Sequence, residues 1–389
     1  MNTQEFVAMI KDKHFFELKR MQHKYSSEKV REMLDTLREM SYAELELKDF
    51  AGNNCVYLPA QSIISGTIIK KLIADNTSKE IFASKAMEEE IESTFRIENI
   101  ESAHESVHRI MQGFAPQNKE EYEILGMKMG LEFIGDPKNM ISEENLHLLY
   151  LMAIGNFLEG ENALPRGSYY RDQTVYIVGD KPYHEGLSPK LLPKYMKELI
   201  QFANQKDEIP ELVKAGILHF YIAYLHPYFD GNGRTARLVH LWYLVQQGFS
   251  STLFYTISKH ISSSKREYYK SFLDIEENYK ISKLLDITPF INYLKKNVYR
   301  KISEENNEEF VMKEFILALR EGKITEKEYN LWNFVLSFYG MSSFSTKQLE
   351  KDFGGAAYAT IRAFVLKFEN LNLLTAQHFG KRVKYCIKK

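Results

Sequence analysis

One short segment, from Leu225 to Arg237 (LHPYFDGNGRTAR), brings a base and a carboxylate close together in the chain. His226 carries an imidazole whose unperturbed pKa of about 6.5 lets it accept a proton at neutral pH. Asp230 supplies a hard oxygen ligand, and Mg²⁺ is usually held by one or two carboxylates plus substrate phosphates. The segment therefore predicts proton abstraction beside a metal-bound phosphate group.

Two glycines and two arginines complete the segment. Gly231 and Gly233 let the backbone approach a ligand without a Cβ clash, and the first amides of the helix that follows are unpaired donors at its positive end. Arg234 and Arg237 lie three residues apart, so a helix presents both on one face for paired hydrogen bonds to phosphate oxygens. The pattern predicts a cradle for a polyphosphate.

Two buried helices must hold this loop. Pro210 suits a first helical turn, and apolar residues recur at helical spacing on both sides of the loop. The stripe before the loop comprises Val213, Ile217, Phe220, Tyr221 and Tyr224, and the stripe after it comprises Leu238, Leu241, Trp242 and Val245.

The segment resembles the signature of the Fic family, His-Pro-Phe-x-Asp/Glu-Gly-Asn-Gly-Arg-x-x-Arg, at every position but one. Tyr228 stands where the family usually has Phe, a mild change at a packing position unless its hydroxyl is buried without a partner. The resemblance implies a protein adenylyltransferase. His226 would deprotonate the hydroxyl of a target Tyr, Thr or Ser, the oxygen would attack the α-phosphorus of ATP, and pyrophosphate would leave.

The resemblance, which covers roughly Ala86 to Lys296, also implies roles for the remaining residues. Asp230 would bind Mg²⁺. A related kinase branch has Lys where Gly233 stands, so the glycine favours AMP transfer over phosphate transfer. The phosphates of ATP would be bound by the loop and the start of the next helix, at Gly231, Asn232, Gly233, Arg234 and Arg237.

A carboxylate upstream lies on a face predicted to be buried. In the helix predicted for AMEEEIESTFRIENI, Glu98 shares one face with Ile91, Thr94 and Phe95, and a buried carboxylate is costly unless it meets a cation. A structural salt bridge is one interpretation. However, Thr94-x-x-x-Glu98-Asn99 resembles the family's inhibitory motif, Ser/Thr-x-x-x-Glu-Gly/Asn, which implies that Glu98 pairs with Arg237 and makes ATP bind out of line.

Apolar spacing of three and four residues predicts a mainly α fold with one short β-hairpin, from Gly167 to Asp180, at the place of the family's target-binding flap. We expect an N-terminal helical region over residues 1–85 and a catalytic core with its inhibitory helix over 86–300. A polar run from Ile302 to Phe310 precedes a third domain over 309–389.

The third domain is predicted to be a winged helix. Thr325 with Glu328, and Ser345 with Gln348, are pairs that cap helix starts. A further apolar stripe (Ile361, Phe364, Val365, Phe368) predicts a third helix, and Gly380 is suited to turn a hairpin after it.

The chain has 389 residues and a net charge of -1, so its overall charge indicates no particular partner. Its two cysteines, Cys55 and Cys386, are far apart in the sequence, and no apolar run is long enough for a signal peptide or a membrane span. We therefore expect a cytosolic protein without membrane association. Its oligomeric state and its target protein, which includes the chain itself as a candidate, stay open.

Two alternative functions also stay open. His104, Glu105 and His108 spell His-Glu-x-x-His, the pattern of a zinc protease, although the usual apolar neighbours and a third ligand motif are missing. A winged helix can also bind DNA through phosphates, and this one would offer basic residues near the chain end: Lys381, Arg382, Lys384, Lys388 and Lys389.

Overall fold

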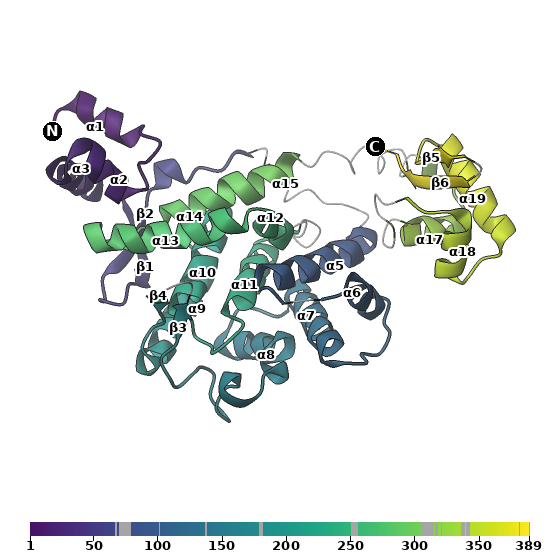
Figure 1. Ribbon diagram of the computed structural model, residues 1–389, viewed down its shortest axis with the longest axis horizontal. Coiled ribbons are helices and arrows are strands. Elements are labelled where there is room, and N and C mark those ends of the chain that lie inside the picture. Colours follow the sequence, from purple (N-terminus) through teal and green to yellow (C-terminus); the bar gives the residue numbers. More distant parts are fainter. Residues whose placement is uncertain are drawn as a thin grey trace. The chain divides into compact units, whose positions relative to one another are not determined.

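The computed structural model describes residues 1–66, 68–69, 79–100, 102–136, 138–178, 182–249, 256–304, 315, 318–319, 321–335, 339, 343–380 and 382–388. The chain forms two compact units, 1–74 with 90–301 and 75–89 with 302–389. Most described residues are helical, and each sheet in the described part of the chain has two strands (Figure 1). The prediction of a mainly α fold is confirmed.

The helices described before the C-terminal module follow one another along the chain, interrupted by two β-hairpins. They are α1 (Thr3–Ile10), α2 (Leu18–Tyr25), α3 (Ser27–Met40), η1 (Pro59–Gln61), α5 (Lys79–Ile97), α6 (His104–Met111), α7 (Lys119–Gly135), α8 (Glu143–Ala153), η2 (Gly155–Phe157), η3 (Gly160–Asn162), η4 (Pro189–Leu191), α9 (Leu192–Asn204), α10 (Glu211–Leu225), α11 (Asn232–Gln246), α12 (Ile257–Ser263), α13 (Lys265–Ser282), α14 (Thr288–Tyr293), η6 (Leu294–Tyr299) and α15 (Arg300–Glu304).

The first helices pack on the same compact unit as the catalytic segment. α2 contacts α13, and Asn278 of α13 bonds to the backbone at both Leu18 and Phe16. Residues 1–74 group with 90–301 in one compact unit, and the domain division at residue 85 stays a prediction.

Strands β1 (Ala43–Lys48) and β2 (Asn54–Tyr57) form a hairpin that our helical prediction for this region missed. Its first strand alternates buried Leu45 and Leu47 with Glu44 and Glu46. That period of two was a strand signal in the sequence.

Helices α10 and α11 lie side by side in the larger unit (Figure 1). Most residues of both are buried, as their apolar stripes predicted. Because both helices are enclosed by the core, the loop between them has little freedom to move, and this rigidity suits a catalytic segment.

The predicted flap is present, but its strands come later than expected. β3 (Tyr176–Val178) pairs with β4 (Pro182–Glu185), with Tyr176 opposite Glu185. The stretch from residue 167 to 175 forms no strand, and residues 179–181, which include Asp180, lie outside the described part. The prediction of strand structure from Gly167 onward was therefore wrong, because residues 167–175 form turns and bends that lead into β3.

The C-terminal unit has its own apolar core around Trp332, Phe344 and Phe368. Its elements are α17 (Glu326–Phe334), α18 (Thr346–Phe353), α19 (Tyr358–Asn370), β5 (Leu374–Phe379) and β6 (Arg382–Ile387). Both predicted capping boxes are formed, and Gly380 turns the hairpin with a φ of 62°. Three helices and a hairpin thus occur in the predicted order, and their assignment as a winged helix stays a prediction.

No described helix combines the length and the apolar composition that a membrane span requires.

Candidate active site

His226 directly follows α10 and has a left-handed backbone, with a φ of 53°. Its Nδ1 lies 3.2 Å from the carbonyl oxygen of Ala223. Only a protonated Nδ1 can donate to a carbonyl, so in the neutral ring Nε2 is the atom that can accept a proton. Burial lowers the pKa of His226 to about 4, despite the opposing effects of the Ala223 carbonyl and Glu98, so the ring is neutral at pH 7.

Asn232 holds the loop in shape. Its Oδ1 accepts from the backbone N–H of Tyr228 at 2.9 Å, and its Nδ2 donates to the Tyr228 carbonyl at 2.8 Å. Gly231 precedes α11 with a φ of 79°, and a Cβ there would lie 2.5 Å from Ile154. The side chain of Asn232 is thus committed to the backbone, and its own N–H remains the group suited to a phosphate.

The two arginines of the segment are buried on α11. Within the described residues, Nε of Arg234 and Nη1 of Arg237 are buried and have no hydrogen-bond partner. Unpaired cationic donors are costly inside a protein. Their position beside the first amides of α11 fits the anion cradle that the sequence predicted.

Asp230 is the half-exposed carboxylate of the loop. Its Oδ1 accepts from the N–H of Gly231 at 2.5 Å, and its Oδ2 lies 3.6 Å from Nη2 of Arg234. About half of the side chain is open to solvent. These oxygens fit a divalent cation that also binds phosphates.

Glu98 reaches the same face of α11 from the end of α5. Its Oε1 accepts from Nη2 of Arg237 at 2.7 Å, and Thr94 accepts from Nε of the same guanidinium at 2.7 Å. Burial, the largest single effect, would raise the pKa of Glu98, but Arg237, Arg234 and Lys265 together outweigh it and hold this pKa below its ordinary value. The ion pair expected from the motif is present, and its inhibitory role stays a prediction.

Two local features fix the position of Glu98. A Cβ at Gly233 would collide with the Glu98 carboxylate, so only glycine leaves room there. Asn99, two residues after the end of α5, has a φ of 56°, a conformation that Gly and Asn tolerate better than other residues. Its side chain accepts from Nζ of Lys265 at 2.6 Å.

Tyr228 stacks on Tyr150, with ring centroids 3.7 Å apart and planes 6° apart. Its hydroxyl is buried and has no hydrogen-bond partner among the described residues. A buried hydroxyl without a partner loses its hydration and gains nothing in return.

We therefore expect Tyr228→Phe to leave the stack intact and to raise the free energy of unfolding by up to about 1–3 kcal/mol. Urea unfolding of the two proteins, followed by tryptophan fluorescence, measures the difference. A loss of more than 1 kcal/mol, on the order of one hydrogen bond, would mean that the hydroxyl has a partner after all.

Sequence reasoning missed a buried arginine beside the loop. Arg171 donates to three backbone carbonyls, those of His226, Gln173 and Leu187. It also missed His184 of β4, which bonds to Glu276 at 2.7 Å and to the Tyr224 carbonyl at 2.7 Å. The sequence carried no signal for either, because an arginine or histidine beside a hairpin is usually exposed.

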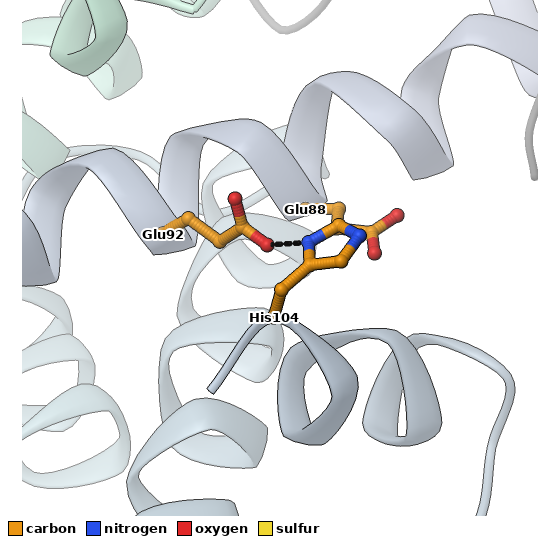
Figure 2. A group of neighbouring side chains, drawn as sticks. All are labelled: Glu88, Glu92 and His104. Atoms are coloured by element: carbon orange, nitrogen blue, oxygen red, sulfur yellow. Dashed lines mark hydrogen bonds and ion pairs between the residues drawn. The ribbon is translucent and has the colours of Figure 1, made fainter. Parts of the chain in front are cut away.

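The His-Glu-x-x-His residues lie on α6, away from the loop. Figure 2 shows His104 at the start of that helix, bonded through Nδ1 to Glu92 of α5, with Glu88 one turn earlier on α5. Nε2 of His108 lies 2.9 Å from Gln112. In the part of the chain that the structure describes, His108 belongs to no group of three metal ligands, so the arrangement does not favour the zinc alternative.

Exposed cations in the described part of the C-terminal unit include Lys347, Lys351 and Arg362, besides those near the chain end. Lys381 and Lys389 lie outside the described residues, Lys388 bonds to Asn372, and Lys367 of α19 pairs with Glu328 at 2.7 Å. Arg382 is exposed and Lys384 is half-buried. The DNA-binding alternative therefore stays a prediction.

The larger unit thus holds His226 at the end of one buried helix and both arginines near the start of the next, the arrangement that the sequence predicted for a phosphate site. Residues 141–244 match the model of the Fic/DOC family, so this part of the chain is similar to that family.

Two relatives carry the name protein adenylyltransferase. The chain is similar to fic-1 of Caenorhabditis elegans, with 25% identity over 218 residues that cover 54% of this chain and 38% of the relative. It is also similar to Fic of Drosophila grimshawi, with 25% identity over 175 residues that cover 45% of this chain and 33% of the relative. The matches thus span well under half of either relative's length.

Solved structures of Fic proteins are also similar. A Fic family protein from Desulfovibrio desulfuricans has 17% identity and a TM-score of 0.49, covering 84% of this chain and 97% of that chain. Residues 134–508 of Fic-1 from C. elegans have 20% identity and a TM-score of 0.44, covering 61% of this chain and 69% of that chain.

Proposed function

We propose that this protein transfers AMP from ATP to a hydroxyl side chain of a target protein. The observation that supports this most is the arrangement around His226. Its Nε2 is the ring atom that can accept a proton, and the loop after it is followed by two buried arginines that each have one nitrogen without a hydrogen-bond partner among the described residues. The names of the similar proteins support the same reaction class.

In the proposed reaction, Nε2 of His226 takes the proton of the target hydroxyl. The hydroxyl oxygen forms a bond to the α-phosphorus of ATP, the bond from that phosphorus to the bridging α,β oxygen breaks, and pyrophosphate leaves. The amides of Gly231, Asn232 and Gly233, with Arg234 and Arg237, hold the phosphates in line. Holding the reactants in this alignment and stabilising the developing charge are the main contributions that such a site makes.

Mg²⁺ is the cation that we propose for this site, held by Asp230 and by the phosphates. When bound, it would neutralise charge on the α- and β-phosphates. The half-exposed carboxylate at the loop fits this role, because its second oxygen has only a long contact to Arg234.

Asp230→Asn is expected to raise the Mg²⁺ concentration that half-saturates AMP transfer by at least about tenfold, because the amide keeps the bond to the Gly231 N–H and loses only the charge. A Mg²⁺ titration of transfer measures this, with Asp35→Asn, an exposed aspartate of α3, as the matched control. An unchanged Mg²⁺ dependence would remove Asp230 from the metal site.

The direct test is incubation with α-labelled ATP, Mg²⁺ and host lysate, followed by detection of labelled protein. Label on the chain itself would identify self-modification. Failure of both the wild type and Glu98→Gly to label any protein would contradict the proposal. We also propose a reducing compartment such as the cytosol, since Cys55 and Cys386 are unpaired.

A further inference from the structure

We infer that Arg171 is a positioning residue that locks the β3–β4 hairpin to His226, so that a target segment paired with the hairpin presents its hydroxyl to Nε2. This inference rests on the proposed function. It assigns to Arg171 a part in bringing the target hydroxyl to His226, which the proposed function does not specify.

Three successive carbonyls of the catalytic segment accept hydrogen bonds from the two stems of the hairpin. Leu225 accepts from the N–H of Leu187 at 3.1 Å, and Pro227 accepts from the N–H of Arg171 at 3.0 Å. Between them, the carbonyl of His226 accepts from Nε of Arg171 at 2.7 Å. The stem that enters the hairpin and the stem that leaves it are thus both fixed to the backbone of the base.

The rest of the Arg171 guanidinium joins the two stems to each other. Nη1 donates to the carbonyl of Gln173 on the entering stem at 2.5 Å, and Nη2 donates to the carbonyl of Leu187 on the leaving stem at 2.6 Å. A planar guanidinium presents its donors in a fixed geometry. One rigid group therefore sets the spacing of both stems and their distance from His226.

The stability of the fold does not by itself explain why an arginine occupies position 171. The side chain is only 2% exposed, and no ion pair between described residues includes it. Burial lowers the pKa of its guanidinium to about 10. A buried cation that meets only neutral carbonyls is costly, and an apolar residue usually packs such a position more favourably.

Arg171 is packed tightly against Gly186, with no room for a side chain at that position. A Cβ on Gly186 would lie 2.6 Å from Nη2 of Arg171 and 3.2 Å from Cβ of His226. The N–H of Gly186 also donates to the carbonyl of Val175 at 3.0 Å, which closes the base of the hairpin. The hairpin, the arginine and the base are therefore in direct contact.

The hydrogen bonds of Arg171 matter for delivery of the target because a target segment that adds as a strand is positioned by the hairpin. A slip of one residue moves a side chain by about 3.3 Å along the strand and turns it to the other face. A misplacement of about 1 Å can already cost about 10² in rate. The hairpin must therefore keep one position relative to Nε2, and Arg171 is the group that joins them.

The test compares Arg171→Lys and Arg171→Met in the Glu98→Gly protein, with Arg166→Met, an exposed arginine five residues earlier, as the matched control. We expect kcat for AMP transfer to a protein target to fall by at least about tenfold with Lys and about 10² with Met. Binding of a non-hydrolysable ATP analogue with Mg²⁺, measured by calorimetry, should change less than twofold, because the phosphate cradle is untouched. A purely structural role would lower both together.

A second readout does not depend on activity. Amide hydrogen exchange at Leu187 should be faster in Arg171→Lys than in the parent, while the control keeps the parental rate. If Arg171→Met does not fold, Arg171→Lys decides the question. Faster exchange in Arg171→Lys, together with a parent that transfers no AMP, would overturn the proposed function and still support the role of Arg171 in holding the hairpin. A parental transfer rate with unchanged exchange in Arg171→Lys would overturn the inference.

Discussion

Replacement of His226 by Asn in the Glu98→Gly protein is expected to abolish AMP transfer, with a loss of at least about 10²–10⁴. Nε2 of His226 is the proton acceptor of the proposed reaction, and an amide cannot take that role. Asn tolerates the left-handed backbone of residue 226 better than Ala does, so His226→Asn should keep the loop conformation and His226→Ala serves as the second variant. Labelling with α-labelled ATP measures the loss.

His23→Ala is the matched control, because this histidine is exposed on α2. Transfer should stay at the parental level in that variant. A folded His226→Asn protein that labels its target at the parental rate would contradict the proposed mechanism.

The dependence of transfer on pH offers an independent check on His226. The ring must be neutral to accept a proton, and burial lowers its pKa to about 4. Activity should therefore fall only as the pH drops toward that value, rather than through the ordinary range of histidine near 6.5. The acid limb of kcat/KM, which reports the free enzyme, measures this pKa, and a midpoint near 6.5 would show that the free enzyme's base is more exposed than described here.

Glu98→Gly is expected to raise AMP transfer by at least about tenfold. The substitution frees the Arg237 guanidinium, whose Nη2 now donates to the Glu98 carboxylate at 2.7 Å. A charge-assisted hydrogen bond contributes about 1.5–3 kcal/mol, and about 1.4 kcal/mol corresponds to one decade in rate. Rates at saturating ATP on several targets measure the gain, with Glu132→Gly, an exposed glutamate of α7, as the control.

The activation should depend on Arg237. In Arg237→Ala, the additional Glu98→Gly change should bring no gain, because the arginine that it would release is gone. A gain of the same size in that background would separate Glu98 from Arg237. Equal labelling by wild type and Glu98→Gly would leave the end of α5 as a structural element with an internal ion pair.

The family resemblance suggests a second role for Glu98, as a base that would position water and remove AMP from a modified target. Incubation of purified modified target with wild type and with Glu98→Gly separates the two roles. Removal by wild type alone would assign both roles to Glu98, and no removal by either protein would leave it as a brake only.

The sequence by itself determined the local parts of this protein. While the roles of His226 and the groups after it stay predictions, the helix start at Asn232 and the shared face of Arg234 and Arg237 could be predicted from the sequence, since both depend only on neighbouring residues. The same holds for the capping boxes at Thr325 and Ser345, where the partners are three residues apart. Tyr228 was the exception in this loop, because the sequence did not determine whether its hydroxyl is buried.

Strand pairing was predicted less well. The β3–β4 hairpin begins nine residues later than the predicted start at Gly167, and the β1–β2 hairpin was missed. A strand is stabilised by the partner and the core against which it lies, so its limits depend on packing that local residue preferences do not contain.

Only the tertiary structure decided which distant groups meet. The sequence pattern indicated that Glu98 faces the core, and the family resemblance alone named its cation. The contact joins residues 139 positions apart, with Thr94 on the same guanidinium. Arg171 gave no signal at all, because its partners are backbone carbonyls, which every residue carries, and only the packing of the hairpin stems against the end of α10 brings three of them within its reach.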